Sequence, residues 1–123
     1  VVTASILTVD DSPSIRVAIK IALTNAGYTV TEAANGAEGI EKAQAAAFDM
    51  IITDLNMPVM DGLTMIEEMR KLPSLMGVPI VFLTTESDAG MKERAKAAGA
   101  TGWLTKPFDP DTLARLAKKV LGR

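Results

Sequence analysis

Short apolar runs alternate with helical patterns along the whole chain. Five of these runs have the length of strands: Ile6–Val9, Tyr28–Ala33, Met50–Thr53, Pro79–Leu83 and Trp103-Leu104. Four are largely apolar, which is typical of strands covered on both faces of a sheet. The second run carries polar residues at alternate positions, so it predicts an edge strand.

The segments between the runs carry helix boundaries. Ser12 supplies a capping hydroxyl before Pro13, and Asn35–Glu38 resembles a capping box. The expected helices run from Ser12-Pro13 to Asn25–Gly27, from Asn35 onward, from Leu63 to Leu72, from Ser87-Asp88 to Gly99, and from Asp109-Pro110 onward.

Strands joined by helical crossovers are parallel, and the crossovers are right-handed. A closed (βα)₈ barrel needs about 250 residues, whereas this chain has 123. The pattern therefore predicts an α/β fold, a doubly wound open parallel sheet of (βα)₅ type, as a single domain over residues 1–123. In the common flavodoxin-like order 2-1-3-4-5, ligands bind where the order reverses, between the first and third strands.

Composition narrows the chemistry. Thirteen Lys and Arg against 15 Asp and Glu give a net charge of −2, which argues against a nucleic-acid binder. The chain has no Cys and no His, so thiolate and imidazole sites are excluded and a reducing cytoplasm is expected. Any metal should be a hard cation such as Mg²⁺. No apolar run approaches the ~20 residues that span a bilayer, and no long exposed apolar stripe is evident, so we expect a monomer away from membranes.

Polar residues follow the predicted strands. Asp10 and Asp11 end the first, Asp54 the third, Thr84 the fourth and Lys106 the fifth. Each alone has an ordinary interpretation, such as a helix cap, a turn residue or a surface lysine. Together they would gather three carboxylates at one edge of the sheet, where mutual repulsion favours a shared divalent cation and a phosphoryl group.

The same acidic loop argues against a flavin site. A flavin phosphate needs hydroxyls and free backbone N–H groups after the first strand, and Asp10-Asp11 would repel it. The sequence contains no GxGxxG or GxxxxGK[ST] motif, so dinucleotide and P-loop functions have no support.

Across its whole length, the chain resembles the receiver domain of bacterial two-component response regulators, especially the single-domain chemotaxis type. The motifs that carry the resemblance are Val9–Ser12, Thr53–Pro58 with Asp61-Gly62, Leu83–Glu86, and Ala98–Ala100 leading to Lys106–Phe108. Each motif alone is weak, but their order along the predicted elements is specific.

The resemblance implies a magnesium-dependent phosphoacceptor site. Asp54 would accept a phosphoryl group from a phosphohistidine on a sensor histidine kinase, or from an acyl phosphate. Asp11 and Asp54 would ligate Mg²⁺ directly, together with the backbone carbonyl of Asn56, and Asp10 would hold a metal water. Lys106 and Thr84 would contact the phosphoryl oxygens.

The resemblance also implies a switch. Thr84 would move towards the phosphoryl group, and the aromatic residue of the fifth strand, here Trp103, would turn from exposed to buried. An ordinary core or rim tryptophan is the alternative interpretation of Trp103. Asn56 and Glu86 would tune the lifetime of the aspartyl phosphate, and the Lys106–Pro107 bond would be cis. Candidate output residues are Met91, Lys92, Trp103 and Arg115.

The sequence is compatible with several functions. The leading hypothesis is a cytoplasmic phosphorylation switch that functions in chemotaxis and binds a target protein such as a flagellar motor component. Such a switch would catalyse only its own phosphorylation and dephosphorylation. A phosphate sink or phosphotransfer shuttle, and a receiver fragment of a larger regulator, are the alternatives. A phosphatase with turnover on small substrates lacks a visible second acid or base.

Overall fold

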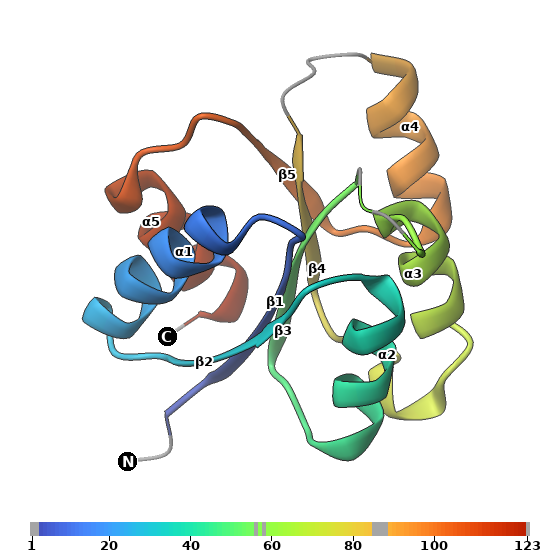
Figure 1. Ribbon diagram of the computed structural model, residues 1–123, viewed down its shortest axis with the longest axis horizontal. Helices are drawn as coiled ribbons and strands as arrows, with labels where there is room; N and C mark the ends of the chain where they lie inside the picture. The colour runs from blue at the N-terminus through green and yellow to red at the C-terminus, as the bar shows by residue number, and fades with distance from the viewer. Residues whose placement is uncertain (1–2, 56, 58, 85–88, 123) are drawn as a thin grey trace.

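The computed structural model describes residues 3–55, 57, 59–84 and 89–122, apart from the side chains of residues 89 and 91. These residues form a five-stranded parallel sheet in the order β2-β1-β3-β4-β5, with helices on both faces (Figure 1). The predicted doubly wound open sheet is confirmed. The strands are β1 (Ser5–Val9), β2 (Thr29–Ala33), β3 (Met50–Asp54), β4 (Ile80–Thr84) and β5 (Gly102–Thr105).

The helices begin close to the expected capping residues. They are α1 (Pro13–Asn25), α2 (Gly36–Ala45), α3 (Gly62–Met69), α4 (Ala89–Ala98) and α5 (Pro110–Leu121). The Asn35 side chain accepts the Glu38 N–H at 2.9 Å, and the Glu38 carboxylate accepts the Ala34 N–H at 3.2 Å. The return bond of this capping box thus reaches the residue before the cap. None of the helices among the described residues is long and apolar enough to cross a membrane.

The third helix is shorter than expected. It begins at Gly62, where the Asp61 carboxylate accepts the Thr64 N–H at 2.8 Å, and ends at Met69 rather than Leu72. A 3₁₀ turn, η1 (Pro73–Leu75), then leads towards β4. Leu72, directly before Pro73, has an extended backbone, as the residue before a proline commonly does. The expected start of the fourth helix at Ser87-Asp88 lies outside the described residues.

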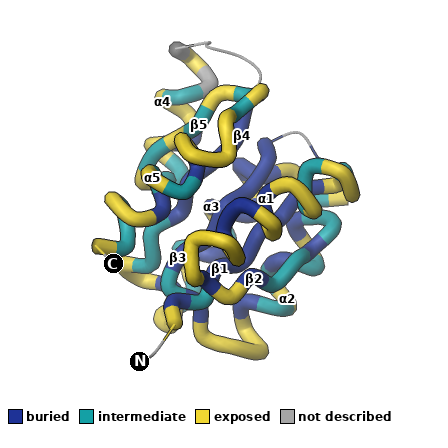
Figure 2. Tube along the Cα trace, turned by 90° about the vertical axis from the view of Figure 1, so that its left-hand side faces the viewer, coloured by how far each residue is buried: buried dark blue, intermediate teal, exposed yellow. Residues whose placement is uncertain are grey.

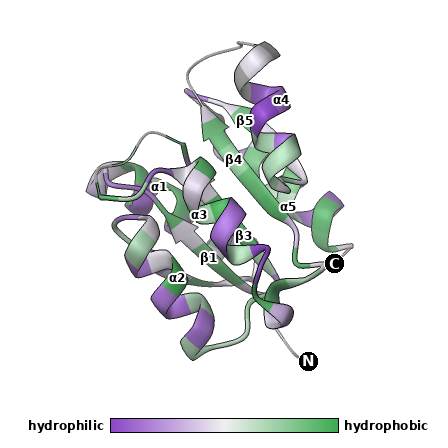
Figure 3. Cartoon of the chain, turned by 90° about the vertical axis from the view of Figure 1, so that its right-hand side faces the viewer, coloured by the Kyte–Doolittle hydropathy of each residue, from purple (hydrophilic) through white to green (hydrophobic). Residues whose placement is uncertain are grey.

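The sheet separates two hydrophobic clusters. Helices α1 and α5 cover one face, and α2, α3 and α4 cover the other (Figure 1). Side chains alternate across β1, so Ile6 packs in the cluster beneath α1 and α5, and Leu7 packs in the cluster beneath α2, α3 and α4. The central strands are buried throughout, while the outward sides of the helices are exposed (Figure 2) and carry hydrophilic residues on α2 and α4 (Figure 3). This burial holds the carboxyl ends of β1, β3 and β4 at one edge.

The two edge strands differ in how well the sequence predicts them. Strand β2 lies at one edge, as its alternating pattern indicates. Strand β5 lies at the other edge, as the order 2-1-3-4-5 predicts. The expectation that both of its faces are covered is wrong, because its residues alternate between half-buried and exposed. The Trp103 residue is 46% exposed there. Two apolar residues are too short a pattern to separate a central strand from an edge strand.

Candidate functional site

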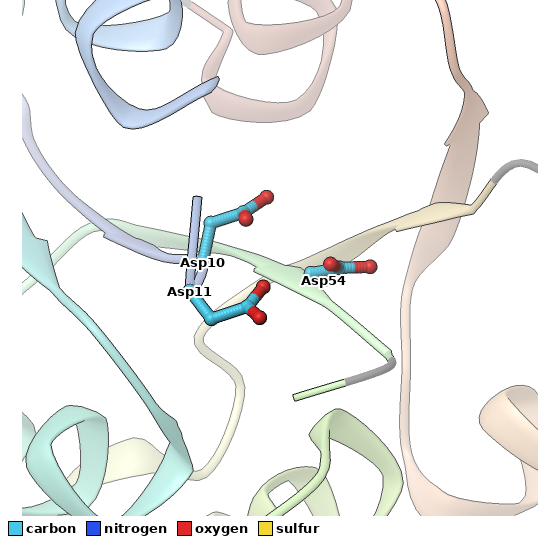
Figure 4. A group of neighbouring side chains, drawn as sticks. All are labelled: Asp10, Asp11 and Asp54. Atoms are coloured by element: carbon cyan, nitrogen blue, oxygen red, sulfur yellow. The ribbon is translucent and has the colours of Figure 1, made fainter. Parts of the chain in front are cut away.

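Three carboxylates meet beyond the carboxyl ends of β1 and β3. Val9 pairs with Thr53 in the parallel register, so the residues that follow them lie side by side. Ligand oxygens of Asp10, Asp11 and Asp54 lie within 4.8 Å of one another (Figure 4). The structure therefore brings together the three acidic residues that the strand ends predicted.

Asp10 is fully buried and held by three neighbours. Its N–H donates to the Ala33 carbonyl at 3.0 Å, its Oδ1 accepts the Ser12 N–H at 2.9 Å, and its Oδ2 lies 3.3 Å from the Lys106 Nζ. Burial raises the pKa of the Asp10 carboxyl, and the negative charge of Asp54 adds to this, while the Ser12 N–H and Lys106 act in the opposite direction. The pKa of Asp10 is therefore raised overall, which means that ionising this buried carboxyl costs free energy.

The other two carboxylates differ in exposure. Asp54 is 8% exposed, and its Oδ1 accepts the Leu55 N–H at 2.8 Å. Asp11 is exposed and makes no hydrogen bond or ion pair with other described residues. Its orientation therefore depends on its backbone, and its oxygens can face an incoming ion.

Lys106 supplies the positive charge beside this cluster. Its Nζ lies 3.3 Å from the Oδ2 atoms of both Asp10 and Asp54, and its side chain is 15% exposed. The Lys106 N–H donates to the carbonyl of the buried Thr84 at 2.8 Å, which joins the ends of β4 and β5. The Lys106–Pro107 peptide is cis, as the resemblance implied.

The donor set fits a hard divalent cation. Three carboxylates against one ammonium leave an excess of negative charge, and all the available donors are oxygen atoms. Mg²⁺ prefers such ligands and commonly keeps several waters and a phosphate oxygen. Asn56, expected to offer a carbonyl ligand and to tune the phosphate lifetime, and Glu86, expected to tune it also, lie outside the described residues.

Trp103 lies on β5 between residues of α4 and α5 and is not part of the acidic cluster. The Lys92 Nζ lies 4.5 Å from its ring centroid, and the Phe82 ring lies 6.3 Å away. Trp103 and Arg115 line a surface pocket of about 320 Å³ between β5 and α5. The side chain of Met91 is outside the described part of the chain.

Two residues for which the sequence predicts no role contact the site, Arg16 and Gly62, the second of which belongs to the Asp61-Gly62 motif. Arg16 Nη1 donates to the Asp10 carbonyl at 2.6 Å. A Cβ added at Gly62 would lie 2.1 Å from the Asp54 carbonyl oxygen, so only glycine lets α3 approach the end of β3 this closely. The Arg16 contact links a helix to a loop six residues earlier, and no motif in the sequence marks it.

The raised pKa of Asp10 predicts a more stable metal-free variant. An acid whose folded pKa lies above its unfolded value stabilises the fold below the unfolded pKa and loses that contribution as the pH rises through the folded pKa. At neutral pH we therefore expect Asp10→Asn to melt higher in EDTA, by about 3–6 °C for each kcal/mol relieved. Calorimetry would measure this, and an equal or lower melting temperature would contradict it.

Replacing Asp10 should also reduce the stabilisation that Mg²⁺ gives to the protein. The ion should raise the melting temperature of the wild type, by the equivalent of about 2.7 kcal/mol at a hundred times its dissociation constant. The increase should be smaller in Asp10→Asn, which has lost one negative charge from the cluster.

Comparison with known protein families agrees with this geometry. Residues 6–118 match the family described as the response regulator receiver domain. The chain is 39% identical over 119 residues to the chemotaxis protein CheY1 of Helicobacter pylori, covering 95% of this chain and 96% of that protein. It is 34% identical to the probable transcriptional regulator ycf29 of Porphyra purpurea, covering 97% of this chain but only 57% of that protein.

Solved structures give the same result. The chemotaxis response regulator CheY4 of Vibrio cholerae superposes with a TM-score of 0.94 at 48% identity, covering 98% of this chain and all of that one. The receiver domain of the sensor histidine kinase PA1611 from Pseudomonas aeruginosa superposes with a TM-score of 0.91 at 32% identity, covering 99% of this chain and 100% of that one. Its structure has a magnesium ion coordinated in the active site cleft.

Proposed function

The chain belongs to the response regulator receiver domain family, and from this premise we propose that it is a magnesium-dependent phosphorylation switch with Asp54 as the phosphoacceptor. One observation carries the proposal: three carboxylates with oxygens within 4.8 Å of one another, and an ammonium 3.3 Å from the Oδ2 of Asp54. We propose that residues 1–123 act as one receiver domain.

The transfer is a substitution at phosphorus. An Asp54 carboxylate oxygen attacks the phosphorus of a phosphohistidine or an acyl phosphate. The bond from phosphorus to the imidazole nitrogen or acyl oxygen breaks, and the leaving group departs with the electron pair. The Leu55 N–H orients the Asp54 carboxylate through a 2.8 Å hydrogen bond, so little reorganisation is needed before attack.

Asp10, Asp11 and Asp54 would hold Mg²⁺, together with the carbonyl of Asn56. When bound, the ion would neutralise negative charge on the phosphoryl oxygens. Lys106 would form an ion pair with a second phosphoryl oxygen, because its ammonium already lies beside the Asp54 carboxylate. Thr84, at the buried end of β4, would offer its hydroxyl to a third. Glu86 and Asn56 are proposed to control water access.

A test of the phosphoacceptor site is the intact mass of the protein after treatment with acetyl phosphate. We expect one added phosphoryl group on the wild type with Mg²⁺ and none in EDTA. Asp54→Ala should gain none under either condition. Equal modification of Asp54→Ala and the wild type would overturn the assignment.

The output role rests on Trp103, the only tryptophan in the chain. Lys92 lies over its ring and the ring is half exposed, so a change in its position should alter its fluorescence. We expect acetyl phosphate with Mg²⁺ to change the fluorescence of the wild type and not of Asp54→Asn. A flat signal from a protein shown to be phosphorylated by mass would refute the switch role of Trp103.

The biological setting follows from similarity to chemotaxis proteins and is proposed on that basis. We propose a cytoplasmic monomer that receives its phosphoryl group from a sensor histidine kinase and binds a target protein such as a flagellar motor component. The competing roles are a phosphate sink and a receiver segment of a larger regulator. The chain spans only about half the length of two of the regulators to which it is similar, which supports the larger-regulator role. Phosphoryl flux measured with candidate kinases and targets distinguishes the three.

A further inference from the structure

We infer that Arg16 is a positioning residue that orients the Asp10-Asp11 peptide for cation binding. The inference rests on the proposed function of the acidic site. Arg16 lies in the first turn of α1, and its side chain is 18% exposed. Its guanidinium makes two contacts: Nη1 donates to the Asp10 carbonyl at 2.6 Å, and Nε lies 3.4 Å from the Glu32 Oε1.

The Asp10 carbonyl belongs to the peptide that joins Asp10 to Asp11. The N–H of Asp10 is already fixed by the Ala33 carbonyl at 3.0 Å, and its Oδ1 by the Ser12 N–H. Arg16 fixes the following carbonyl and thus the plane of the next peptide. This matters most for Asp11, whose carboxylate has no hydrogen bond or ion pair with the described residues that could hold it.

Glu32 keeps the guanidinium in place from the other side. It lies on β2, in register with Thr8 of β1, so it stands beside the end of the strand that carries the acidic pair. Lys20 also contacts Glu32, with 3.6 Å between the Lys20 Nζ and the Glu32 Oε2, but within the described part of the chain it makes no hydrogen bond or ion pair with the acidic loop. An arginine can reach a carbonyl and a carboxylate at once through its fork of N–H groups, whereas a lysine presents a single nitrogen.

Charge and positioning predict opposite effects for the loss of Arg16. Removing a cation near an acidic site should tighten Mg²⁺ binding if only long-range electrostatics operates. Releasing the peptide that carries Asp11 should weaken it, by about tenfold, the effect typical of residues that orient metal ligands. Lys20→Met is the matched control, because it removes the same charge from the same Glu32 and leaves the Asp10 carbonyl bonded.

The experiment is calorimetric titration of Mg²⁺ into the metal-free wild type, Arg16→Met, Arg16→Lys and Lys20→Met, with unfolding by urea in EDTA for each. We expect about tenfold weaker binding in Arg16→Met, an intermediate loss in Arg16→Lys, and no loss in Lys20→Met. The Asp11 amide resonance of the metal-free protein should move in both Arg16 variants and stay in place in Lys20→Met. Should Arg16→Met fail to fold, Arg16→Lys decides the outcome.

Two results would overturn the inference. Unchanged or tighter Mg²⁺ binding by a folded Arg16 variant would mean that Arg16 only stabilises the fold. An equal loss in Lys20→Met would mean that the effect passes through Glu32 rather than the Asp10 carbonyl. Failure of the wild type itself to bind Mg²⁺ would instead refute the proposed function of the site, which separates the two claims.

Discussion

A Lys106→Met variant is expected to accept a phosphoryl group from acetyl phosphate about 100-fold more slowly than the wild type at saturating Mg²⁺. The Lys106 ammonium lies 3.3 Å from the Oδ2 atoms of Asp10 and Asp54. It is therefore placed to stabilise charge on a phosphoryl group at Asp54. A fixed charge in a largely buried site is worth far more than one in solvent.

The rate is measured by intact mass against time. Mg²⁺ affinity should not fall, because removing a cation from an acidic cluster favours a metal ion. The control is Lys71→Met, which loses the same charge from an exposed residue paired with Glu68 at 3.1 Å. An unchanged rate in Lys106→Met, or an equal decrease in Lys71→Met, would contradict the role of Lys106.

Gly62→Ala is expected to lower the free energy of unfolding by about 3 kcal/mol or more. The added Cβ would lie 2.1 Å from the Asp54 carbonyl oxygen and 2.9 Å from the Leu55 Cα. Both obstacles are backbone atoms, so no side-chain rotation can relieve the overlap. The start of α3 or the end of β3 must move, and Asp54 with it, so Mg²⁺ binding should weaken as well.

Urea unfolding in EDTA measures the first effect and calorimetric titration the second. Gly102→Ala is the matched control, because a Cβ at Gly102 meets no atom within 4 Å. We expect its stability to lie within about 0.5 kcal/mol of the wild type. A Gly62→Ala protein as stable as Gly102→Ala would show that the approach of α3 to β3 is not fixed by this glycine.

Sequence motifs such as helix caps predict much of the fold, because the residues that form each motif also contact one another in the structure. The hydroxyl of Ser12 and the side chain of Asp109 cap α1 and α5 at the expected positions. The convergence of Asp10, Asp11 and Asp54 follows from the parallel arrangement of β1 and β3, which places adjacent strand ends at one edge. Only the strand order had to be taken from what is common in such folds.

Features that depend on tertiary contact were not predictable. The partial exposure of β5, the reach of Arg16 to the Asp10 carbonyl and the approach of Gly62 to Asp54 arise from packing between segments. Val59 shows a further limit. It has a φ of 71°, in the left-handed region that a β-branched residue strongly disfavours, so its own preference argues against the conformation it adopts.

The central claim is that Asp54 itself forms the aspartyl phosphate. Treatment with acetyl phosphate and Mg²⁺, reduction with borohydride, and peptide mapping by tandem mass spectrometry would locate the modified carboxyl. The account predicts that residue 54 alone is converted to homoserine, and only when Mg²⁺ is present. Conversion at residue 10 or 11 with residue 54 intact would contradict it.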